Sequence, residues 1–207
     1  MHFVSYYYDR DETKSTYYKT CTARVESQLH SYGYKTSFNY INFAEQGLNT
    51  TYLKLNMIKP KYLLQKMQEL NDSVVWIDAD CYLKARLEEF ENLQDFDIGY
   101  CIRHHDNKTP HAAILYFNNT DNAKQFLTDW QAINEIKEKD DTYQCSEHCT
   151  LIDLLNETKI PLRIMEFRGI AHSGVYEIDQ RIPANTGIKL WIGISPDAWE
   201  YERAKNQ

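Results

Sequence analysis

The stretch SVVWIDADCYL, residues 73–83, places two carboxylates at the end of an apolar run. Four apolar residues, 74–77, lead directly into Asp78 and Asp80. Short continuous apolar runs are typical of strands buried inside parallel sheets, and open α/β sheets bind ligands beyond the carboxyl ends of their strands. We therefore expect a strand at 74–77, with Asp78 and Asp80 at the edge of the sheet where ligands bind.

Two carboxylates that are separated by one residue can share a hard divalent cation. Mg²⁺ and Mn²⁺ take oxygen ligands and are held by one or two carboxylates together with substrate phosphates. On this interpretation the site takes a phosphorylated compound. The alternative is that Asp-x-Asp begins an ordinary loop, because so short a pattern is common in an acidic protein.

Strand-like and helix-like segments alternate around this stretch. The segments with strand chemistry are 3–9, 34–43, 74–77, 97–102, 112–118 and 160–167. The segments with helical periodicity are 13–33, 50–70, 120–139 and 146–157, of which the second is interrupted by Pro60. This alternation predicts an α/β fold, a mainly parallel central sheet flanked by helices on both faces.

Length and charge narrow the classes of function. The chain has 207 residues without a linker-like stretch, which predicts a single domain over 1–207. Asp and Glu number 30 against 23 Lys and Arg, and the basic residues are scattered, so we expect no nucleic acid partner.

Targeting signals and cysteines bear on the compartment. No apolar run approaches the roughly 20 residues of a membrane helix, and the first residues lack the pattern of a signal peptide. We expect a soluble, cytoplasmic protein with no membrane span. The five cysteines lack the spacing of a disulfide framework, so reduced thiols are expected.

Longer segments resemble a known family of enzymes. The segment IKPKYLLQKMQELNDSVVWIDADCYL, 58–83, resembles the stretch that ends in the DxD motif of GT-A fold glycosyltransferases, and most resembles their galactosyl- and xylosyltransferase-like branches. HAAILYFNNTDNAKQFLTDWQ, 111–131, resembles the strand and acceptor-side helix of that family, and IAHSG, 170–174, resembles its late loop with a metal-binding histidine. The order of these motifs is more specific than any one of them.

This resemblance implies a fold, an activity and a metal site. The fold would be GT-A-like and Rossmann-related, with a nucleotide-sugar-binding half at about 1–105 and an acceptor-side half at about 106–207. The activity would be transfer of a hexose from a nucleotide diphosphate sugar, a UDP-sugar by expectation, to a hydroxyl of a glycan or saccharide acceptor. Asp80 would bind Mn²⁺ or Mg²⁺, Asp78 would reach the donor ribose and the metal, and His172 would be the third protein ligand.

The end of the first strand is where this family holds the base and ribose of the donor. Tyr6, Tyr7 and Tyr8 offer rings for stacking on a uracil, and Asp9 and Arg10 can bond the ribose or diphosphate. Aromatic residues of strands are more often core than ligand contacts, so we expect only one or two of the tyrosines to touch the nucleotide.

Two lysines are assigned to the nucleotide site by the same resemblance. Lys59 belongs to the Lys-Pro helix that precedes the DxD strand. Lys189 is the candidate diphosphate contact, although the family pattern H-x-x-G-x-x-K-P-W is met loosely, because Leu190 replaces Pro and the separation from His172 is longer.

The segment CSEHC, 145–149, stands where many members of this fold carry two polar residues at the start of a helix. Glu147 and His148 are the candidate catalytic residues, and Glu147 can serve an inverting or a retaining scheme. Alternatively Glu147 only complements the helix dipole. Cys145, His148 and Cys149 also resemble half of a zinc site, but no second pair stands at structural-zinc spacing.

Two other functions remain open from the sequence. A phosphohydrolase of the haloacid dehalogenase type also carries an apolar strand followed by D-x-D, but its motif belongs to the first strand, whereas two predicted strands precede Asp78 here. A GT-A-like module that binds a nucleotide sugar or glycan without turnover is the second alternative.

Overall fold

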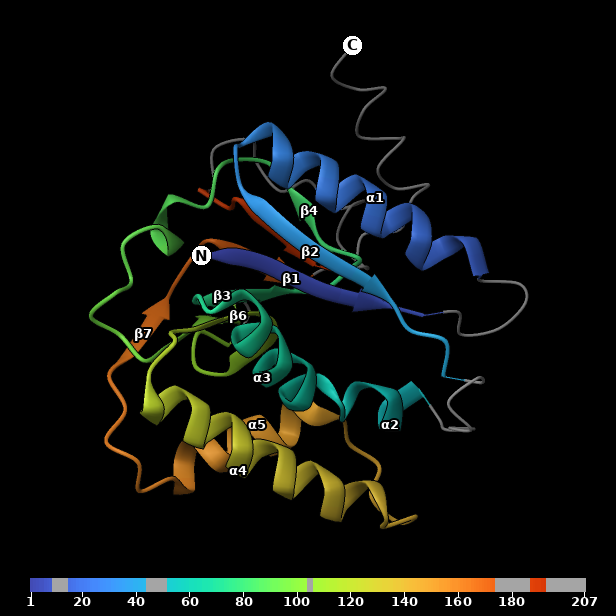
Figure 1. The fold of residues 1–207 in the computed structure, drawn as a ribbon, viewed down its shortest axis with the longest axis vertical. Helices are drawn as coiled ribbons and strands as arrows, with labels where there is room; N and C mark the ends of the chain where they lie inside the picture. Colours follow the sequence, from blue (N-terminus) through green and yellow to red (C-terminus); the bar gives the residue numbers. More distant parts are fainter. Residues whose placement is uncertain (9–14, 44–51, 104–105, 174–186, 193–207) are drawn as a thin grey trace.

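The computed structural model describes residues 1–8, 15–43, 52–103, 106–173 and 187–192, and its elements are drawn in Figure 1. Six strands form the central sheet in the order β2-β1-β3-β6-β5-β7. Their bounds are β1 His2–Tyr7, β2 Lys35–Tyr40, β3 Val74–Ile77, β5 Ile98–Ile102, β6 Pro110–Phe117 and β7 Ile164–Phe167.

The direction of the strands confirms a mainly parallel sheet. The pairs β1·β2, β1·β3 and β5·β7 are parallel, whereas β6 runs antiparallel to both β3 and β5. The short connection 103–109 between β5 and β6 explains the reversal, because only antiparallel neighbours can be joined without a long crossover. As a result, the start of β6 lies at the same edge of the sheet as the carboxyl ends of β3 and β5.

Helices cover both faces of this sheet. Figure 1 shows α1 (Ser15–Ser31) on one face and α3 (Lys59–Leu70), α4 (Asp121–Glu138) and α5 (Glu147–Glu157) on the other. In β3, Val75 and Ile77 pack with the core on the α1 side, while Val74 and Trp76 pack with the core of the other helices. Burial on both faces is the reason that β3 is a continuous apolar run.

The helix predicted at 50–70 is two helices, α2 (Tyr52–Asn56) and α3. Pro60 lies in the first turn of α3, where its missing N–H is not needed for the helix. The ends of the other helices follow similar rules. Gly33, which has a φ of 82°, comes just after α1, and the side chains of Thr120 and Ser146 cap α4 and α5 by accepting backbone N–H bonds.

A second, three-stranded sheet lies beside the first, in the order β4-β9-β8. Its strands are β4 (Tyr82–Leu83), β8 (Ala171–Ser173) and β9 (Leu190–Ile192). Since β4 follows Asp80 by two positions, this sheet links the end of β3 to the late part of the chain. It brings the backbone of His172, which is part of β8, to within two strands of the segment after the carboxylate pair.

The cysteines differ from the expectation of free thiols. Cys145, which precedes α5, and Cys149, which lies in its first turn, form a disulfide with 6.2 Å between their Cα atoms. Cys21, Cys81 and Cys101 are free and buried.

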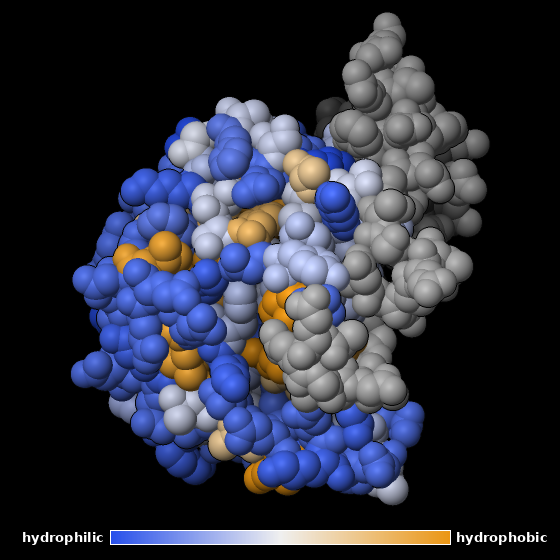
Figure 2. All heavy atoms as spheres, turned by 45° about the vertical axis from the view of Figure 1, so that its right-hand side comes forward, coloured by the Kyte–Doolittle hydropathy of each residue, from blue (hydrophilic) through white to orange (hydrophobic). Residues whose placement is uncertain are grey.

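The surface gives two further observations. On the face seen in Figure 2 the coloured surface is mostly hydrophilic, with apolar side chains in small separate patches. None of the helices in the described residues is both long enough and apolar enough to span a membrane.

Candidate functional site

A pocket of about 210 Å³ opens at the edge of the sheet where β1 and β3 end and β6 begins. Its walls come from these strand ends and from the starts of α1, α3 and α5. The lining residues are Tyr6, Tyr7, Tyr8, Tyr18, Asn56, Lys59, Trp76, Asp78, Ala79, Asp80, His111, Ala112, Ala113, Ser146, Glu147 and His148. The pocket therefore brings together eight of the predicted site residues, namely Tyr6, Tyr7, Tyr8, Lys59, Asp78, Asp80, Glu147 and His148.

Asp78 and Asp80 lie at the end of β3, as the apolar run predicts. Oδ1 of Asp78 accepts hydrogen bonds from Nε1 of Trp76 at 2.6 Å and from Nζ of Lys59 at 3.2 Å. Burial, together with the negative charge of Asp78, raises the pKa of Asp80 to about 7. The pair is thus two crowded carboxylates, which a bound cation would stabilise.

The donor set suits Mg²⁺ or Mn²⁺ in the way that these ions usually bind. Among the residues that the structure describes, no three His, Cys, Asp or Glu side chains gather closely enough to hold a metal. Two carboxylates are nevertheless sufficient when substrate phosphates complete the coordination. The side chain of His172 lies outside the described atoms, so its role as third ligand stays a prediction.

Helix α1 fixes the turn that carries Asp80. Nη2 of Arg24 donates to the carbonyl oxygen of Cys81 at 2.9 Å. One turn further along the helix, the Gln28 amide donates to the carbonyl oxygen of Leu83 at 2.9 Å and accepts from the backbone nitrogen of Leu83 at 3.1 Å. These contacts hold residues 81–83 against α1 and so limit the positions that Asp80 can take.

Lys59 connects the carboxylate pair to the start of α5. Its side chain is 2 % exposed, and Nζ donates to Oε1 of Glu147 at 2.7 Å, to Oδ1 of Asp78 and to the carbonyl oxygen of Ala112, both at 3.2 Å. Burial by itself lowers the pKa of Lys59, but the charges of Asp78 and Glu147 outweigh it and raise the pKa. All three N–H bonds of this ammonium therefore have acceptors within the protein.

Glu147 has one carboxylate oxygen that is buried without a partner. Oε1 accepts from Lys59, while Oε2 makes no hydrogen bond within the described part of the chain. Burial raises the pKa of Glu147 although Lys59 acts to lower it. A buried, unpaired carboxylate oxygen beside a pocket is suited to accept a hydrogen bond from a ligand.

His148 has the opposite character. Burial and the positive charges of Arg103, His111 and Lys59 lower its pKa to about 3. The imidazole is therefore neutral at physiological pH and is a weak base. Of the two predicted catalytic residues, Glu147 is the better proton acceptor.

The tyrosines at the end of β1 divide between core and pocket. The hydroxyl of Tyr6 donates to the carbonyl oxygen of Leu55 at 3.3 Å, and its ring lies 5.0 Å from that of Trp76, so Tyr6 is tied into the core. Tyr8 packs against Tyr18 of α1 at 5.8 Å between ring centroids, and both rings line the pocket. Asp9 and Arg10 lie outside the described residues.

Lys189 is in contact with acidic side chains. Its ammonium pairs with Glu89 at 2.7 Å and lies 3.9 Å from Glu88. Its assignment to the diphosphate stays a prediction.

Sequence reasoning missed several pocket residues, among them the polar Tyr18, Asn56, His111 and Ser146. His111 begins a segment that reads as a strand, but its place at this edge depends on the antiparallel direction of β6. The helix-cap preference of serine before an acidic residue is a signal that could have placed Ser146 beside the site.

Comparisons with known proteins identify the fold. No family model and no curated protein matches the chain by sequence. Among solved structures, a glycosyltransferase involved in the glycosylation of the major capsid of PBCV-1 is similar at a TM-score of 0.63 and 12 % identity, over 99 % of this chain and 98 % of that one. The galactosyltransferase LgtC, solved in complex with donor and acceptor sugar analogs, is similar at a TM-score of 0.58 and 12 % identity, over 100 % of this chain and 94 % of that one.

The glycosyltransferase GlyE of Streptococcus pneumoniae TIGR4 is similar at a TM-score of 0.56 and 12 % identity, over 97 % of this chain and 59 % of that one. These similarities confirm the fold that the order of sequence motifs implied. They do not favour a haloacid dehalogenase, in which the D-x-D would follow the first strand rather than β3. The chain has the GT-A fold of solved glycosyltransferases.

Proposed function

We propose that the protein is a metal-dependent glycosyltransferase that moves a hexose from a UDP-sugar to a hydroxyl of a glycan or saccharide acceptor. The observation that carries this proposal is the single pocket in which Asp78, Asp80 and the unpaired Oε2 of Glu147 meet at the carboxyl edge of the sheet. The similarity to LgtC, which was solved with donor and acceptor sugar analogs, supports the choice of ligands.

The proposal divides the pocket into two sides. The nucleotide is bound on the side of residues 1–105, where Tyr8 and Tyr18 present rings for the base. Asp78 and Asp80, with His172 as a third ligand, hold Mn²⁺ or Mg²⁺, which when bound neutralises the charge of the leaving diphosphate. The acceptor is bound on the side of residues 106–207, next to Glu147.

Glu147 is the group proposed to act on the acceptor. Lys59 holds Oε1, which leaves Oε2 to accept the proton of the attacking hydroxyl. Burial raises the pKa of Glu147 and so strengthens it as a base. The ordered walls of the pocket orient donor and acceptor and exclude water.

In this proposal Lys59 does not bind a phosphate of the donor. Since its three donors are already matched by protein acceptors, Lys59 serves to position Asp78 and Glu147 relative to each other. In this proposal the donor makes no direct contact with Lys59, which affects it only by positioning Asp78 and Glu147.

A panel of nucleotide sugars with Mn²⁺ tests the activity. We expect Mn²⁺-dependent release of UDP from at least one UDP-hexose, and a large loss of this release in Glu147→Gln with UDP binding retained. If UDP binds but no donor in the panel is turned over, the protein is a binding module and the proposal fails.

The His172 assignment has its own test. Mn²⁺ is titrated in the presence of UDP into the parent, His172→Ala and His172→Gln, and the alanine variant should bind Mn²⁺ more weakly than the glutamine variant. Affinity should also fall below a pH of about 6.5, because only the neutral imidazole is a ligand. Unchanged affinity in His172→Ala removes this residue from the site.

A further inference from the structure

Polar residues follow one another along the edge of the sheet in a defined order. The neighbouring strands are β1, β3, β6 and β5, and β6 is antiparallel to β3 and β5. Tyr8 after β1, Asp78 after β3, His111 at the start of β6 and Arg103 after β5 therefore share this edge. The chemistry changes from aromatic through acidic to basic from one end of the row to the other.

Arg103 is a partly buried cation at the basic end. Nη2 lies 2.8 Å from Nδ1 and 3.0 Å from Nε2 of His148, so the guanidinium packs against that imidazole. Its Nε is buried without a hydrogen-bond partner. No carboxylate in the described ranges forms an ion pair with Arg103.

The surroundings of Arg103 compensate its charge only in part. Burial lowers the pKa of Arg103, and Asp106 acts in the opposite direction. Oδ1 of Asp106 accepts from the backbone nitrogens of Lys108 and Thr109, both at 3.0 Å, and so holds the turn 106–109 in shape. A guanidinium remains charged at this degree of burial, and a partly desolvated cation favours an anionic partner.

His148 joins this cation to the pocket. Its ring lines the pocket, lies 5.8 Å from that of His111 and contacts the guanidinium of Arg103. Since the low pKa of His148 keeps the imidazole neutral, it contributes hydrogen bonding but no charge. The positive charge beside His148 comes from Arg103.

We propose that the acceptor is a saccharide that carries an anionic group, a carboxylate or a phosphate, which Arg103 binds beside His148. A planar guanidinium fork matches both groups with paired N–H bonds. The inference rests on the proposed function, because it places the acceptor at the β6 and β5 end of the edge and the donor at the β1 and β3 end. Among the described residues Asp106 is the charge that acts to compensate Arg103, and a neutral acceptor would add nothing to it.

The test measures binding of three saccharides to the protein loaded with Mn²⁺ and UDP. The probes are a methyl glucuronide, a glucose phosphate and the neutral methyl glucoside, followed by calorimetry or ligand-detected NMR. A charge-assisted bond predicts that at least one acidic probe binds about tenfold or more tightly than the neutral one. Which acidic probe binds distinguishes the carboxylate from the phosphate.

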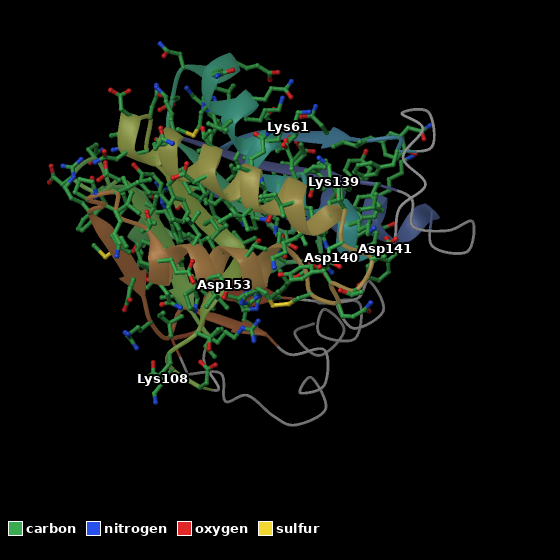
Figure 3. All side chains as sticks on the ribbon, turned by 90° about the horizontal axis from the view of Figure 1, so that it is seen from below. Lys61, Lys108, Lys139, Asp140, Asp141 and Asp153 are labelled. Carbon is green, nitrogen blue, oxygen red and sulfur yellow. A yellow bond between two sulfur atoms is a disulfide. The ribbon has the colours of Figure 1, made fainter. Side chains whose placement is uncertain are left out.

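Variants of Arg103 test whether this residue causes the preference for the acidic probe. Arg103→Gln should remove the preference for the acidic probe, Arg103→Lys should keep part of it, and UDP affinity should not change in either. Lys108→Gln is the matched control, because Lys108 belongs to the same loop and Figure 3 shows it pointing away from the fold. It removes the same charge and should leave the preference intact.

Two results overturn the inference: equal binding of acidic and neutral probes by the parent, or an undiminished preference in Arg103→Gln. A loss of UDP affinity in Arg103→Gln would instead place Arg103 at the donor and also contradict it. If Arg103→Gln does not fold, the inference is tested by comparing the preference for the acidic probe in the parent and in Arg103→Lys. Failure of the proposed function is seen separately, as absence of Mn²⁺-dependent UDP binding in the parent.

Discussion

The end of β3 and the start of α5 supply carboxylates to the same pocket, but they are placed by different means. Asp78 and Asp80 follow four buried residues of one strand, so their position depends on adjacent sequence. Glu147 is held by Lys59, which lies 88 positions away and is buried beneath both groups. Adjacent sequence therefore positions Asp78 and Asp80 at the strand end, whereas the position of Glu147 relative to them depends on one buried cation, Lys59.

The two regions also differ in how their charge is compensated. Glu147 has a protein cation at 2.7 Å, while Asp80 has a carboxylate as its neighbour and a raised pKa. The charge of Glu147 is thus matched by Lys59 within the chain, although its Oε2 has no partner among the described residues. For the carboxylate pair we propose a cation that is bound from outside the chain.

Asp80→Ala tests the strand end and should have the largest effect. Metal-dependent UDP binding should weaken by about 100-fold or more, since even residues that only support a ligand cost about 10–100-fold in metal affinity. The metal-free protein should keep its fold and stability, because the substitution relieves repulsion between carboxylates. Asp95→Ala, at an exposed aspartate, is the control. Parent-like Mn²⁺ and UDP binding in Asp80→Ala would place the metal elsewhere.

Lys59→Met tests the link between the two regions. Removing one partner of a buried ion pair leaves an uncompensated charge, so the free energy of unfolding should fall by about 3–5 kcal/mol in urea denaturation. Lys59→Met combined with Glu147→Leu should recover much of that stability but not the activity. A cost below about 1 kcal/mol would show that Lys59 does not hold Glu147 as described.

The pH dependence of the stability of the metal-free protein tests whether the charge of Asp80 lacks compensation in the folded state. The pKa of Asp80 is about 7 in the folded protein, against an ordinary pKa of 3.8. The folded state then binds more protons than the unfolded state between these values, so stability should fall as the pH rises from 4 to 7, by about 3 kcal/mol. Asp80→Asn or saturating Mn²⁺ should remove this slope. A parent whose stability is flat or rises over that range, after correction with Asp80→Asn, contradicts the assignment.

Gln28→Ala should have the smallest effect. It removes both bonds from α1 to the backbone of Leu83 and loosens the turn after Asp80 without touching the carboxylates. Mn²⁺ affinity should fall by about tenfold or less, with the melting temperature of the metal-free protein little changed. Gln125→Ala, an exposed glutamine of α4, is the matched control, and equal effects of the two variants would mean that α1 does not position the metal turn.

Much of the fold follows from patterns that adjacent residues encode. The apolar run 74–77 predicts β3, and Asp78 and Asp80 follow it directly in the sequence. Thr120 and Ser146 mark the starts of α4 and α5. The direction of β6 does not follow in this way, because a strand pattern has the same period in either direction. That direction is what brings His111 to the pocket.

The long-range contacts of the site were the hardest to foresee. The family resemblance assigns Lys59 to the nucleotide site, but its contacts with Asp78 and Glu147 depend on the packing of α3 on the sheet. The pairing of Arg103 with His148 similarly joins a strand end to a helix start 45 positions later. Charge and spacing within a segment carry no information about such partners.

Isothermal titration of UDP into the protein, once with Mn²⁺ and once with EDTA, tests the central claim most directly. The claim is that Asp78 and Asp80 hold a metal through which the donor diphosphate is bound. It predicts tight binding with Mn²⁺ and weak or no binding in EDTA, and a correspondingly larger rise in melting temperature with the metal. Equal UDP affinity in the two conditions would show that binding does not run through the carboxylate pair and would contradict the claim.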